Sequence, residues 1–326
     1  MSTKFGVLGV GQVGMEHVKA ILKTDNAELS AIADIDKSKG KEVTQKKKTV
    51  QYFKDYQDLL DSDLELDAII NCLPHDMHYQ SSLEVAQRGL HTLLEKPICL
   101  SLENADRLIE IYEDNDLKLS ISFVHRFRTE MLEAKRLLDE GVIGKPATLM
   151  DNFCSQGGKY VPGWVWDKNS AGGGVLMYGG IHALDRILWF LDEMPFRVYA
   201  QSQTYSQKTD CEDGLVSILE FDSGVQASLF ENSPGFLTVS RWETEVFGSK
   251  GMMRINFGEG IEVSTDRDHY VRDYERYDHF KRQLEDFLNA IENNSTPWIT
   301  GKDGKRSLVL AKKIYESART GERIEL

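Results

Sequence analysis

Short apolar runs alternate with amphipathic stretches through the first 124 residues. The runs are typical of buried strands and occupy residues 5–8, 29–33, 68–73, 92–94 and 119–123. The stretches between them place apolar side chains at helical spacing, as in residues 14–22, 78–88 and 101–114. Strands that alternate with helices form βαβ units, so this part of the chain predicts a parallel sheet covered by helices.

A different pattern follows a helical stretch over residues 129–140, which stops at Gly141. Two pairs of apolar runs come next, and a glycine-containing turn joins each pair: residues 215–221 with 225–230, and residues 243–247 with 252–257. Runs joined in this way are typical of β-hairpins, so we expect an antiparallel sheet here. Two further helical patterns, near residues 279–293 and 308–319, close the chain.

The change of pattern predicts two domains, 1–124 and 125–326. A chain of 326 residues is long enough for two hydrophobic cores. The first domain is expected to be of the α/β class, because its strands and helices alternate. The pattern leaves open whether the C-terminal helix packs on the first domain.

The amino-acid composition disfavours several classes of function. The chain is 41% hydrophobic and 28% charged, as in an ordinary globular protein, and it carries a formal net charge of −13. This acidity disfavours a broad surface for nucleic acid or for an anionic membrane. The four cysteines are far apart and form no C-x-x-C pair, so no zinc or redox signature is present. No secretory leader and no apolar run of about 18 residues is evident, so we expect a cytoplasmic protein without a membrane span.

A glycine-rich turn follows the first predicted strand and opens a helix. It consists of Gly9, Val10, Gly11, Gln12, Val13 and Gly14. The spacing of its glycines matches the G-x-G-x-x-G fingerprint of dinucleotide-binding folds, in which the turn brings a pyrophosphate close to the helix N-terminus. We therefore expect these residues to bind a dinucleotide.

An acidic residue, Asp34, ends the next strand 20 residues beyond Gly14. Its carboxylate can accept hydrogen bonds from the ribose 2′- and 3′-hydroxyls and would repel a 2′-phosphate. No arginine follows it directly, because Ile35 and Asp36 come next. The sequence therefore predicts NAD as the cofactor, with NADP less favoured. The alternative is that Asp34 only caps a helix from a loop.

The charged pair Glu95-Lys96 stands directly before Pro97, where the fourth predicted strand stops. In open α/β sheets the carboxyl ends of the strands face the crevice where ligands bind. A lysine there can donate a hydrogen bond to a substrate hydroxyl and stabilise a developing alkoxide. The alternative is a solvated surface salt bridge between Lys96 and Glu95.

Four segments occur in one order along the chain: GVLGVGQVGMEH, NCLPHDMH, EKP and AGGGVLMYGGIHALD. Together they resemble the Gfo/Idh/MocA family of oxidoreductases (glucose-fructose oxidoreductase, inositol dehydrogenase and rhizopine catabolism proteins). CEDGLVSILEFDSGVQASL, EVFGSKGMMRI and ESARTGERIEL are similar to the family's C-terminal sheet and ending, so the resemblance covers almost the whole chain. It implies an N-terminal Rossmann domain and a C-terminal α+β domain with a large, mostly antiparallel sheet.

The resemblance implies roles for the motifs of the first domain. Lys96 corresponds to the family's catalytic lysine beside the nicotinamide and the reacting hydroxyl, and Glu95 to a residue near the nicotinamide ribose. The family's cofactor crevice runs past Leu73, Pro74 and His78. His75 and His78 are spaced like a pair of metal ligands, but no third ligand is evident and the family's chemistry uses none, so no metal is expected.

His182 follows Gly172-Gly-Gly174 on a predicted helix. The resemblance implies that His182 is the acid/base that moves the hydroxyl proton, a task that suits a side chain with a pKa near neutrality. Taken alone, a helical histidine is more often structural. Many family members carry aspartate four residues earlier, where this chain has Tyr178, so we expect Tyr178 to share the site. Asp185 matches a family position and either orients His182 or packs the helix.

Two more groups are candidates for contact with the substrate. His125 and Arg126 follow the last strand of the first domain and are expected to contact cofactor or substrate, with a structural ion pair as the alternative for Arg126. Tyr160, Trp164 and Trp166 lie in an aromatic-rich segment before the glycines. Their rings either stack on a sugar face, close over the nicotinamide, or pack in a core or a subunit contact.

The predicted function is NAD-dependent hydride transfer at a secondary hydroxyl of a sugar, cyclitol or sugar derivative. Two alternatives stay open: an NAD-dependent glycosidase that oxidises its substrate transiently, and a non-catalytic NAD(P)-binding sensor or regulator. One face of the second-domain sheet lacks predicted helices and the family commonly pairs such faces, so we expect a homodimer or homotetramer. Neither nucleic acid nor a membrane is expected as a partner.

Overall fold

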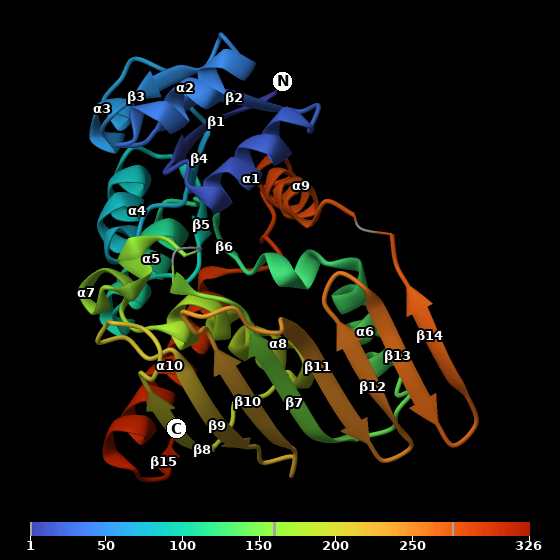
Figure 1. Cartoon of the computed structure of the whole chain (residues 1–326). Coiled ribbons are helices and arrows are strands. Elements are labelled where there is room, and N and C mark those ends of the chain that lie inside the picture. The colour runs from blue at the N-terminus through green and yellow to red at the C-terminus, as the bar shows by residue number, and fades with distance from the viewer. Residues whose placement is uncertain (1, 159–160, 276) are drawn as a thin grey trace. The chain divides into compact units, whose positions relative to one another are not determined.

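The computed structural model describes residues 2–158, 161–275 and 277–326, and the chain divides into two compact units. The first unit combines Met1–Val124 with Asp278–Lys305, and the second combines His125–Tyr277 with Arg306–Leu326. Each unit is built around a sheet of its own (Figure 1). Segments far apart in the sequence therefore contribute to the same unit.

The first unit contains a six-stranded sheet in the order β3-β2-β1-β4-β5-β6, and every neighbouring pair is parallel. Its strands are β1 (Thr3–Leu8), β2 (Ala27–Ala33), β3 (Gln51–Phe53), β4 (Ala68–Asn71), β5 (His91–Glu95) and β6 (Leu119–Ser122). The parallel sheet predicted from the alternating pattern is confirmed, and it is Rossmann-like, as the resemblance implies. In doubly wound sheets of this strand order, ligands bind beyond the carboxyl ends of the strands.

Helices cover both faces of this sheet (Figure 1). They are α1 (Gln12–Leu22), α2 (Lys37–Lys46), α3 (Tyr56–Leu60), η1 (His75–Met77), α4 (His78–Gln87), α5 (Leu102–Asp114) and α9 (His279–Glu292). Successive side chains of β1 point to opposite faces, so Val7 packs in the cluster with α1 and α9 while Leu8 packs in the cluster with α3 and α4. Ser101 caps α5 as a helix start of this type requires, and its hydroxyl accepts a hydrogen bond from Asn104 N–H at 3.3 Å.

The second unit contains a nine-stranded sheet in the order β14-β13-β12-β11-β7-β10-β9-β8-β15. Its strands are β7 (Pro146–Cys154), β8 (Arg197–Gln203), β9 (Gly214–Glu220), β10 (Gln226–Asn232), β11 (Arg241–Gly248), β12 (Gly251–Asn256), β13 (Gly260–Thr265), β14 (His269–Asp273) and β15 (Ile324–Glu325). β7 and β10 are parallel, and the other neighbouring pairs are antiparallel. The large, mostly antiparallel sheet is therefore confirmed, and β9–β10 and β11–β12 are the two predicted hairpins.

The remaining helical segments are η2 (Val124–Phe127), α6 (Thr129–Asp139), η4 (Gly163–Trp166), α7 (Lys168–Ala171), the π-helical turn η5 (Leu176–Gly180), α8 (Ile181–Leu191) and α10 (Gly301–Thr320). The first residues of α10, through Lys305, belong to the first unit. α6 packs against β12 and β13, and η5 packs against β10. On β10 Leu229 is buried whereas Phe230 is 48% exposed, so the two faces of the strand differ in cover. None of the described helices combines the length and the apolar run that a membrane span requires.

The last helix begins earlier than the pattern predicts. α10 starts at Gly301, seven residues before the expected start at residue 308. The Asp303 carboxylate accepts hydrogen bonds from Thr300 N–H at 2.9 Å and from the Thr300 hydroxyl at 2.8 Å. A Cβ at Gly304 would lie 2.9 Å from the Ile121 side chain, so the first turn packs too closely for larger residues. Apolar periodicity cannot detect a helix start made of glycines and polar residues.

Candidate active site

The turn between β1 and α1 contains three glycines with different surroundings. Gly9 has a positive φ of 80°, and a Cβ there would lie 2.7 Å from the Cys72 carbonyl oxygen. A Cβ at Gly14 would lie 2.0 Å from the Gly9 carbonyl oxygen, so both positions need glycine for the turn itself. A Cβ at Gly11 would meet nothing within 4 Å. The turn is therefore open at Gly11, beside the N-terminus of α1, as the approach of a pyrophosphate requires.

Asp34 follows β2 and holds the glycine turn in place. Its Oδ2 accepts a hydrogen bond from Val10 N–H at 2.8 Å, and its Oδ1 accepts one from Asp36 N–H at 2.8 Å. The residue that caps α2 is Asp36, whose carboxylate accepts from Ser38 N–H, so the helix-cap alternative for Asp34 is wrong. Ile35 is 84% exposed. The Asp34 carboxylate thus lies at the carboxyl edge of the sheet, next to the open turn.

Glu95 is the last residue of β5, and Lys96 follows it before a cis peptide bond to Pro97. The two residues are 8% and 9% exposed, so the alternative of a solvated surface pair is wrong. Oε1 of Glu95 lies 3.0 Å from Nε2 of His17 on α1, and Oε2 accepts a hydrogen bond from Lys96 N–H at 3.3 Å. His17 belongs to the first quoted segment, but its role does not follow from the motif alone.

Burial and charge set the protonation of this pair. Burial lowers the pKa of Lys96 to about 8, against the negative charge of Glu95, which acts to raise it. Burial acts to raise the pKa of Glu95, but the hydrogen bond and charge of His17 and the charge of Lys96 outweigh it, and this pKa is lowered. At neutral pH Glu95 is therefore a carboxylate, and Lys96 is an ammonium group that loses its proton near pH 8.

His78 braces two loops at the same edge of the sheet. It is fully buried, with Nδ1 2.7 Å from the Pro97 carbonyl oxygen and Nε2 2.8 Å from the Leu73 carbonyl oxygen. Burial lowers its pKa. This placement corrects the expectation that His78 itself contacts the cofactor, because both ring nitrogens are directed at backbone oxygens inside the unit. Leu73 and Pro74 are half-buried. Among the described residues, no group of three or more His, Cys, Asp or Glu side chains is arranged to hold a metal ion.

The glycines before η5 allow close packing in the second unit. A Cβ at Gly173 would lie 2.0 Å from the Tyr315 hydroxyl oxygen. A Cβ at Gly174 would lie 1.9 Å from the Glu212 carbonyl oxygen. The Glu212 carboxylate accepts hydrogen bonds from the N–H groups of Gly174 and Leu176 at 2.8 and 3.1 Å, and from the Tyr315 hydroxyl at 2.8 Å. Glu212 thus holds the start of the helical segment, a role that sequence reasoning missed.

Tyr178 and His182 lie where the π-helical turn η5 runs into α8. Both side chains are half-buried. The His182 ring stacks on the His125 ring, with centroids 3.9 Å apart and planes 20° apart. Trp242 and Phe257 contact His125 at centroid distances of 5.7 and 5.1 Å. The structure therefore brings His125 and His182 together, in an aromatic surrounding. Single π-helical turns inside helices occur frequently at functional sites.

Arg126 forms a buried bidentate ion pair with Asp185 of α8. Nε donates to Oδ2 at 2.9 Å and Nη2 donates to Oδ1 at 2.5 Å, and the two residues are 6% and 2% exposed. This geometry is that of a structural ion pair, the alternative raised for Arg126. It engages both carboxylate oxygens of Asp185.

A second buried ion pair includes the next residue of α8. Arg186 donates to Asp151 Oδ2 on β7 from Nε at 2.9 Å and from Nη2 at 2.6 Å. The Thr244 hydroxyl donates to the same oxygen at 2.7 Å, and Nη1 of Arg186 lies 3.5 Å from Nδ1 of His125. Glu231 on β10 is fully buried, and burial together with the charge of Asp151 raises its pKa well above the usual value. These partners belong to no short motif, so the sequence does not reveal them.

The structure describes only part of the aromatic segment before the glycines. Trp164 and Trp166 lie in η4 and are half-buried. Tyr160 lies outside the described residues. Two further aromatic side chains, Phe153 on β7 and Trp242 on β11, have ring centroids 5.0 Å apart. Since Trp242 also contacts His125, these strand residues extend the aromatic surrounding beyond the segment that the sequence points to.

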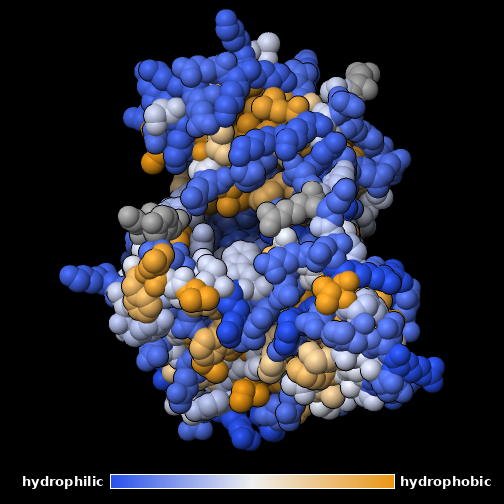
Figure 2. Space-filling model, turned by 45° about the vertical axis from the view of Figure 1, so that its right-hand side comes forward, coloured by the Kyte–Doolittle hydropathy of each residue, from blue (hydrophilic) through white to orange (hydrophobic). Residues whose placement is uncertain are grey.

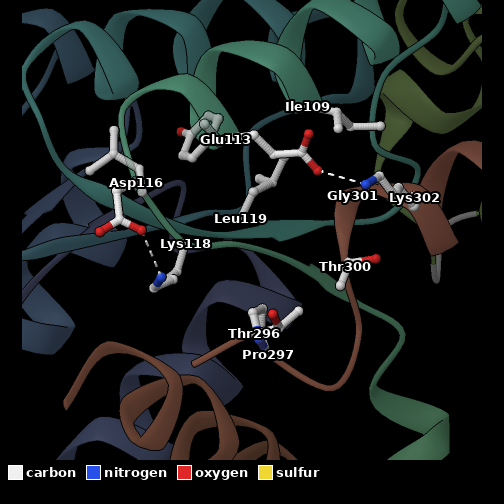
Figure 3. A pocket seen from close by; sticks show the side chains of 12 residues that line it. Ile109, Glu113, Asp116, Lys118, Leu119, Thr296, Pro297, Thr300, Gly301 and Lys302 are labelled. Carbon is white, nitrogen blue, oxygen red and sulfur yellow. Dashed lines mark hydrogen bonds and ion pairs between the residues drawn. The ribbon is translucent and has the colours of Figure 1, made fainter. Parts of the chain in front are cut away.

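A surface pocket of about 240 Å³ opens on the first unit between α5, β6 and residues 296–302 (Figure 3). Its charged side chains are paired with one another. Lys118 donates to Asp116 at 3.3 Å, and Nζ of Lys302 lies 2.8 Å from Oε1 of Glu113. Leu119 in the pocket wall is the first residue of β6, so the pocket lies at the amino ends of the parallel strands. Ligands of doubly wound sheets bind at the opposite edge, which excludes this pocket as the cofactor site.

Comparisons with known proteins agree with this architecture. The family model described as "Oxidoreductase family, NAD-binding Rossmann fold" matches residues 3–123, and that of the "GFO/IDH/MocA C-terminal domain" matches residues 131–254. The myo-inositol 2-dehydrogenase of Thermotoga maritima is 29% identical over 332 residues, 97% of each chain. The D-xylose 1-dehydrogenase (NADP(+)) 2 of Haloferax volcanii is 28% identical over 332 residues, 99% of each chain. The structure of aldose-aldose oxidoreductase from Caulobacter crescentus has a TM-score of 0.89 at 22% identity and covers 100% of both chains.

Proposed function

Because the chain belongs to the Gfo/Idh/MocA family of oxidoreductases with an NAD-binding Rossmann fold, we propose that it transfers hydride between a secondary hydroxyl of a sugar, cyclitol or sugar derivative and the nicotinamide of NAD. The observation that carries this proposal is the buried Lys96 at the carboxyl edge of the first sheet, with a pKa of about 8. The inositol and xylose dehydrogenases among the relatives support a polyol or sugar as the substrate class.

The first unit would hold the cofactor at the carboxyl edge of its sheet. The open backbone at Gly11 and the N-terminus of α1 suit a pyrophosphate, and the Asp34 carboxylate suits a ribose. We assign cofactor binding to Gly9, Gly11, Gln12, Val13, Gly14, Asp34, Leu73, Pro74, Glu95 and Lys96. When bound, the nicotinamide supplies the hydride acceptor or donor, and the protein supplies position and proton movement.

The preference for NAD over NADP rests on charge. The carboxylates of Asp34 and Asp36 follow β2 directly, and a 2′-phosphate beside them would meet like charge. One relative is named as NADP(+)-dependent, so the choice of cofactor varies among similar chains. The dissociation constants of NADH and NADPH at one ionic strength test the preference. Equal or tighter binding of NADPH would contradict it.

Three side chains are assigned to the movement of the hydroxyl proton. The Lys96 ammonium donates a hydrogen bond to the substrate oxygen and stabilises negative charge as hydride leaves the carbon. His182 takes up the hydroxyl proton in oxidation and returns it in reduction. Tyr178 donates a hydrogen bond from its hydroxyl, in place of the carboxylate common in the family. The half-buried positions of Tyr178 and His182 leave part of each side chain accessible.

Substrate contacts are assigned to the second unit. Of the neighbouring residues His125 and Arg126, we assign His125 to the substrate, because its ring stacks on His182. Arg126 is instead paired with Asp185. Trp164 and Trp166 offer ring faces of the kind that stack on sugars. Tyr160 is assigned the same role on the sequence alone.

The division of work follows the two sequence domains. We assign NAD binding to residues 1–124 and substrate binding and oligomerisation to residues 125–326. Apolar side chains are exposed on neighbouring strands, namely Ile218 on β9 and Phe230 on β10, at 47% and 48%. Figure 2 shows separate apolar patches among hydrophilic side chains on one face of the molecule. An apolar strand face of this kind is usually covered by another subunit, so the exposure of Ile218 and Phe230 supports a homodimer or homotetramer. A single species of 37.0 kDa in light scattering at micromolar concentration would contradict this oligomeric state.

The decisive experiment is a screen of sugars, cyclitols and sugar nucleotides for NADH formation from NAD. Formation of NADH with one class of substrate supports the dehydrogenase. Release of a sugar from a glycoside without net NADH would instead indicate the NAD-dependent glycosidase. Tight NADH binding without turnover across the panel would indicate the sensor or regulator.

A further inference from the structure

His17 lies on the buried face of α1 and is completely inaccessible to solvent. Its Nε2 is 3.0 Å from Oε1 of Glu95. A carboxylate only accepts hydrogen bonds, so Nε2 carries the hydrogen in this pair. Nδ1 is also buried and has no hydrogen-bond partner among the described residues, and the ring meets the Phe280 ring edge-on at a centroid distance of 5.0 Å.

An apolar residue would suit position 17 of α1 better than histidine as far as packing alone is concerned. The other buried residues of α1 are small or apolar: Gly14, Val18, Ala20 and Ile21. A buried nitrogen without a hydrogen-bond partner is unfavourable. An apolar side chain at position 17 would pack against Phe280 and avoid that cost. The hydrogen bond to Glu95 is therefore the interaction that separates His17 from an ordinary core residue.

The other polar groups near the pair act less strongly on the Glu95 carboxylate than His17 does. Polar groups that face Glu95 or Lys96 from neighbouring segments include, besides His17, those of Cys72, His78 and Ser122. Burial raises the pKa of the Cys72 thiol, which keeps it neutral. His78 directs both ring nitrogens to backbone oxygens. The Ser122 hydroxyl donates to Gln283 at 3.0 Å and also lies at hydrogen-bonding range of Glu95, with a smaller effect on the pKa of Glu95 than His17 has. His17 is thus the side chain that acts most strongly on the Glu95 carboxylate, through its hydrogen bond and its charge, and Ser122 adds a smaller contribution.

We propose that His17 is a positioning residue for Lys96: it fixes the Glu95 carboxylate, and the fixed carboxylate keeps the lysine side chain charged in its buried place. The proposal rests on the proposed function for the catalytic role of Lys96. Without His17 the carboxylate is free to turn or to take up a proton, and the buried ammonium group loses its counter-charge. The contact also connects α1, which follows the glycine turn, to the side chain that would donate to the substrate.

The test measures the pKa of Lys96 from the pH dependence of its acetylation, read by mass spectrometry of its peptide. His17→Leu removes the donor and keeps a similar volume. The pKa of Lys96 is expected to fall by about 0.5 unit or more, because burial then acts against a weaker counter-charge. His17→Gln, whose amide can donate from a similar place, is expected to restore at least half of the shift. An unchanged or raised pKa in His17→Leu overturns the proposal.

A second substitution tests whether His17 acts through Glu95. Glu95→Gln removes the charge and is expected to lower the pKa of Lys96 by itself. In the double variant His17→Leu/Glu95→Gln, this pKa is expected to equal that of Glu95→Gln within about 0.2 unit, since the two changes share one route. A further fall in the double variant overturns the proposal. His91→Gln, at the amino end of β5, is the matched control and should leave Lys96 unchanged.

Failure of this proposal and failure of the proposed function give different results. Acetylation needs no turnover, so the shift is measurable whether or not a sugar is oxidised. Normal turnover in Lys96→Ala would overturn the catalytic role of Lys96. A His17→Leu variant that only lowers the melting temperature, with the pKa of Lys96 unmoved, would overturn the positioning role alone. If His17→Leu does not fold, His17→Asn, whose shorter amide cannot reach Glu95, takes its place with the same expectation.

Discussion

The two units gather their candidate groups by different means. In the first unit the groups follow the carboxyl ends of parallel strands: the glycine turn after β1, Asp34 after β2, Leu73 after β4 and Glu95 at the end of β5. In the second unit they come from a π-helical turn, a helix and several strands, and buried ion pairs such as Arg126 with Asp185 connect them. Backbone geometry aligns the first set, whereas side-chain pairing aligns the second.

This difference determines what a substitution does. A strand end stays in place when the side chain that follows it is replaced, and the Glu95 carboxylate keeps its hydrogen bond with His17 when Lys96 is lost. A change at Lys96 is therefore expected to alter chemistry more than folding. Removal of a buried arginine from the second unit leaves its partner as an uncompensated charge, so a change there alters stability first. Catalysis and stability are therefore easier to separate in the first unit than in the second.

The largest expected effect is on turnover in Lys96→Ala. Loss of the ammonium group removes charge stabilisation at the substrate oxygen, and turnover is expected to fall by about 10²–10⁴-fold. The affinity for NADH is expected to stay within a few fold, because the glycine turn and Asp34 are untouched. Steady-state kinetics and NADH titration measure the two effects. Lys118→Ala, at the opposite edge of the same sheet, is the matched control, and equal losses in both variants would contradict the assignment.

His182→Ala tests the catalytic role of a residue in the second unit in the same way. Turnover is expected to fall by about 10²–10⁴-fold, because the hydroxyl proton loses its acceptor. The stack with His125 is lost as well, so a modest loss of thermal stability is expected, in contrast to Lys96→Ala. His269→Ala is the control, since that side chain is 60% exposed. A His182→Ala enzyme within about threefold of wild type would rule out the proton-transfer role.

Arg126→Met sharpens the contrast between the units. It leaves the buried Asp185 carboxylate without its partner, and the free energy of unfolding is expected to fall by about 3–5 kcal/mol. Denaturant titration measures this loss. Arg136→Met breaks exposed ion pairs on α6 and is expected to cost much less. A stable Arg126→Met protein with a raised KM for the substrate would instead return Arg126 to the binding site.

The first unit's candidate site is largely predictable from the sequence, because each residue belongs to a short motif beside a strand. The glycine turn, Asp34 and the Glu95-Lys96 pair all fall at the edge of the sheet to which the alternating pattern assigns them. The residue that escaped notice is His17, whose partner Glu95 lies 78 residues away. A pairing of that length depends on how α1 packs on the sheet, which periodicity does not specify.

The candidate site of the second unit is less predictable from the sequence. Its motif predicts Tyr178 and His182, but the groups that hold them in place come from distant segments. Glu212 lies 38 residues from Gly174, and Asp151 lies 35 residues from Arg186. Strand pairing brings these residues together, and the parallel contact of β7 with β10 has no local turn signal. From the sequence alone, a single charged residue in such a segment is therefore predicted to be exposed to solvent, and only the pairing of the strands shows that it is buried.

The smallest expected effect, and the one that bears most on the second unit, is that of Tyr178→Phe. Tyr178 occupies the place of a carboxylate common in the family, and a phenol cannot copy it. Unperturbed phenols ionise near pH 10, so a neutral hydroxyl donates a hydrogen bond at pH 7 but is a poor base. Donation to the substrate oxygen is worth more in the transition state, where negative charge develops, than in the ground state.

Removal of this one hydroxyl is therefore expected to lower turnover at least tenfold, roughly 1.4 kcal/mol in the barrier. NADH affinity and thermal stability are expected to stay nearly unchanged, because Tyr178 is half-buried in the π-helical turn and Phe keeps the ring. Tyr199→Phe, on β8 of the same unit, is the control for loss of a hydroxyl. Normal turnover in Tyr178→Phe would show that the ring only packs, and would assign the proton transfer to His182 and Lys96 alone.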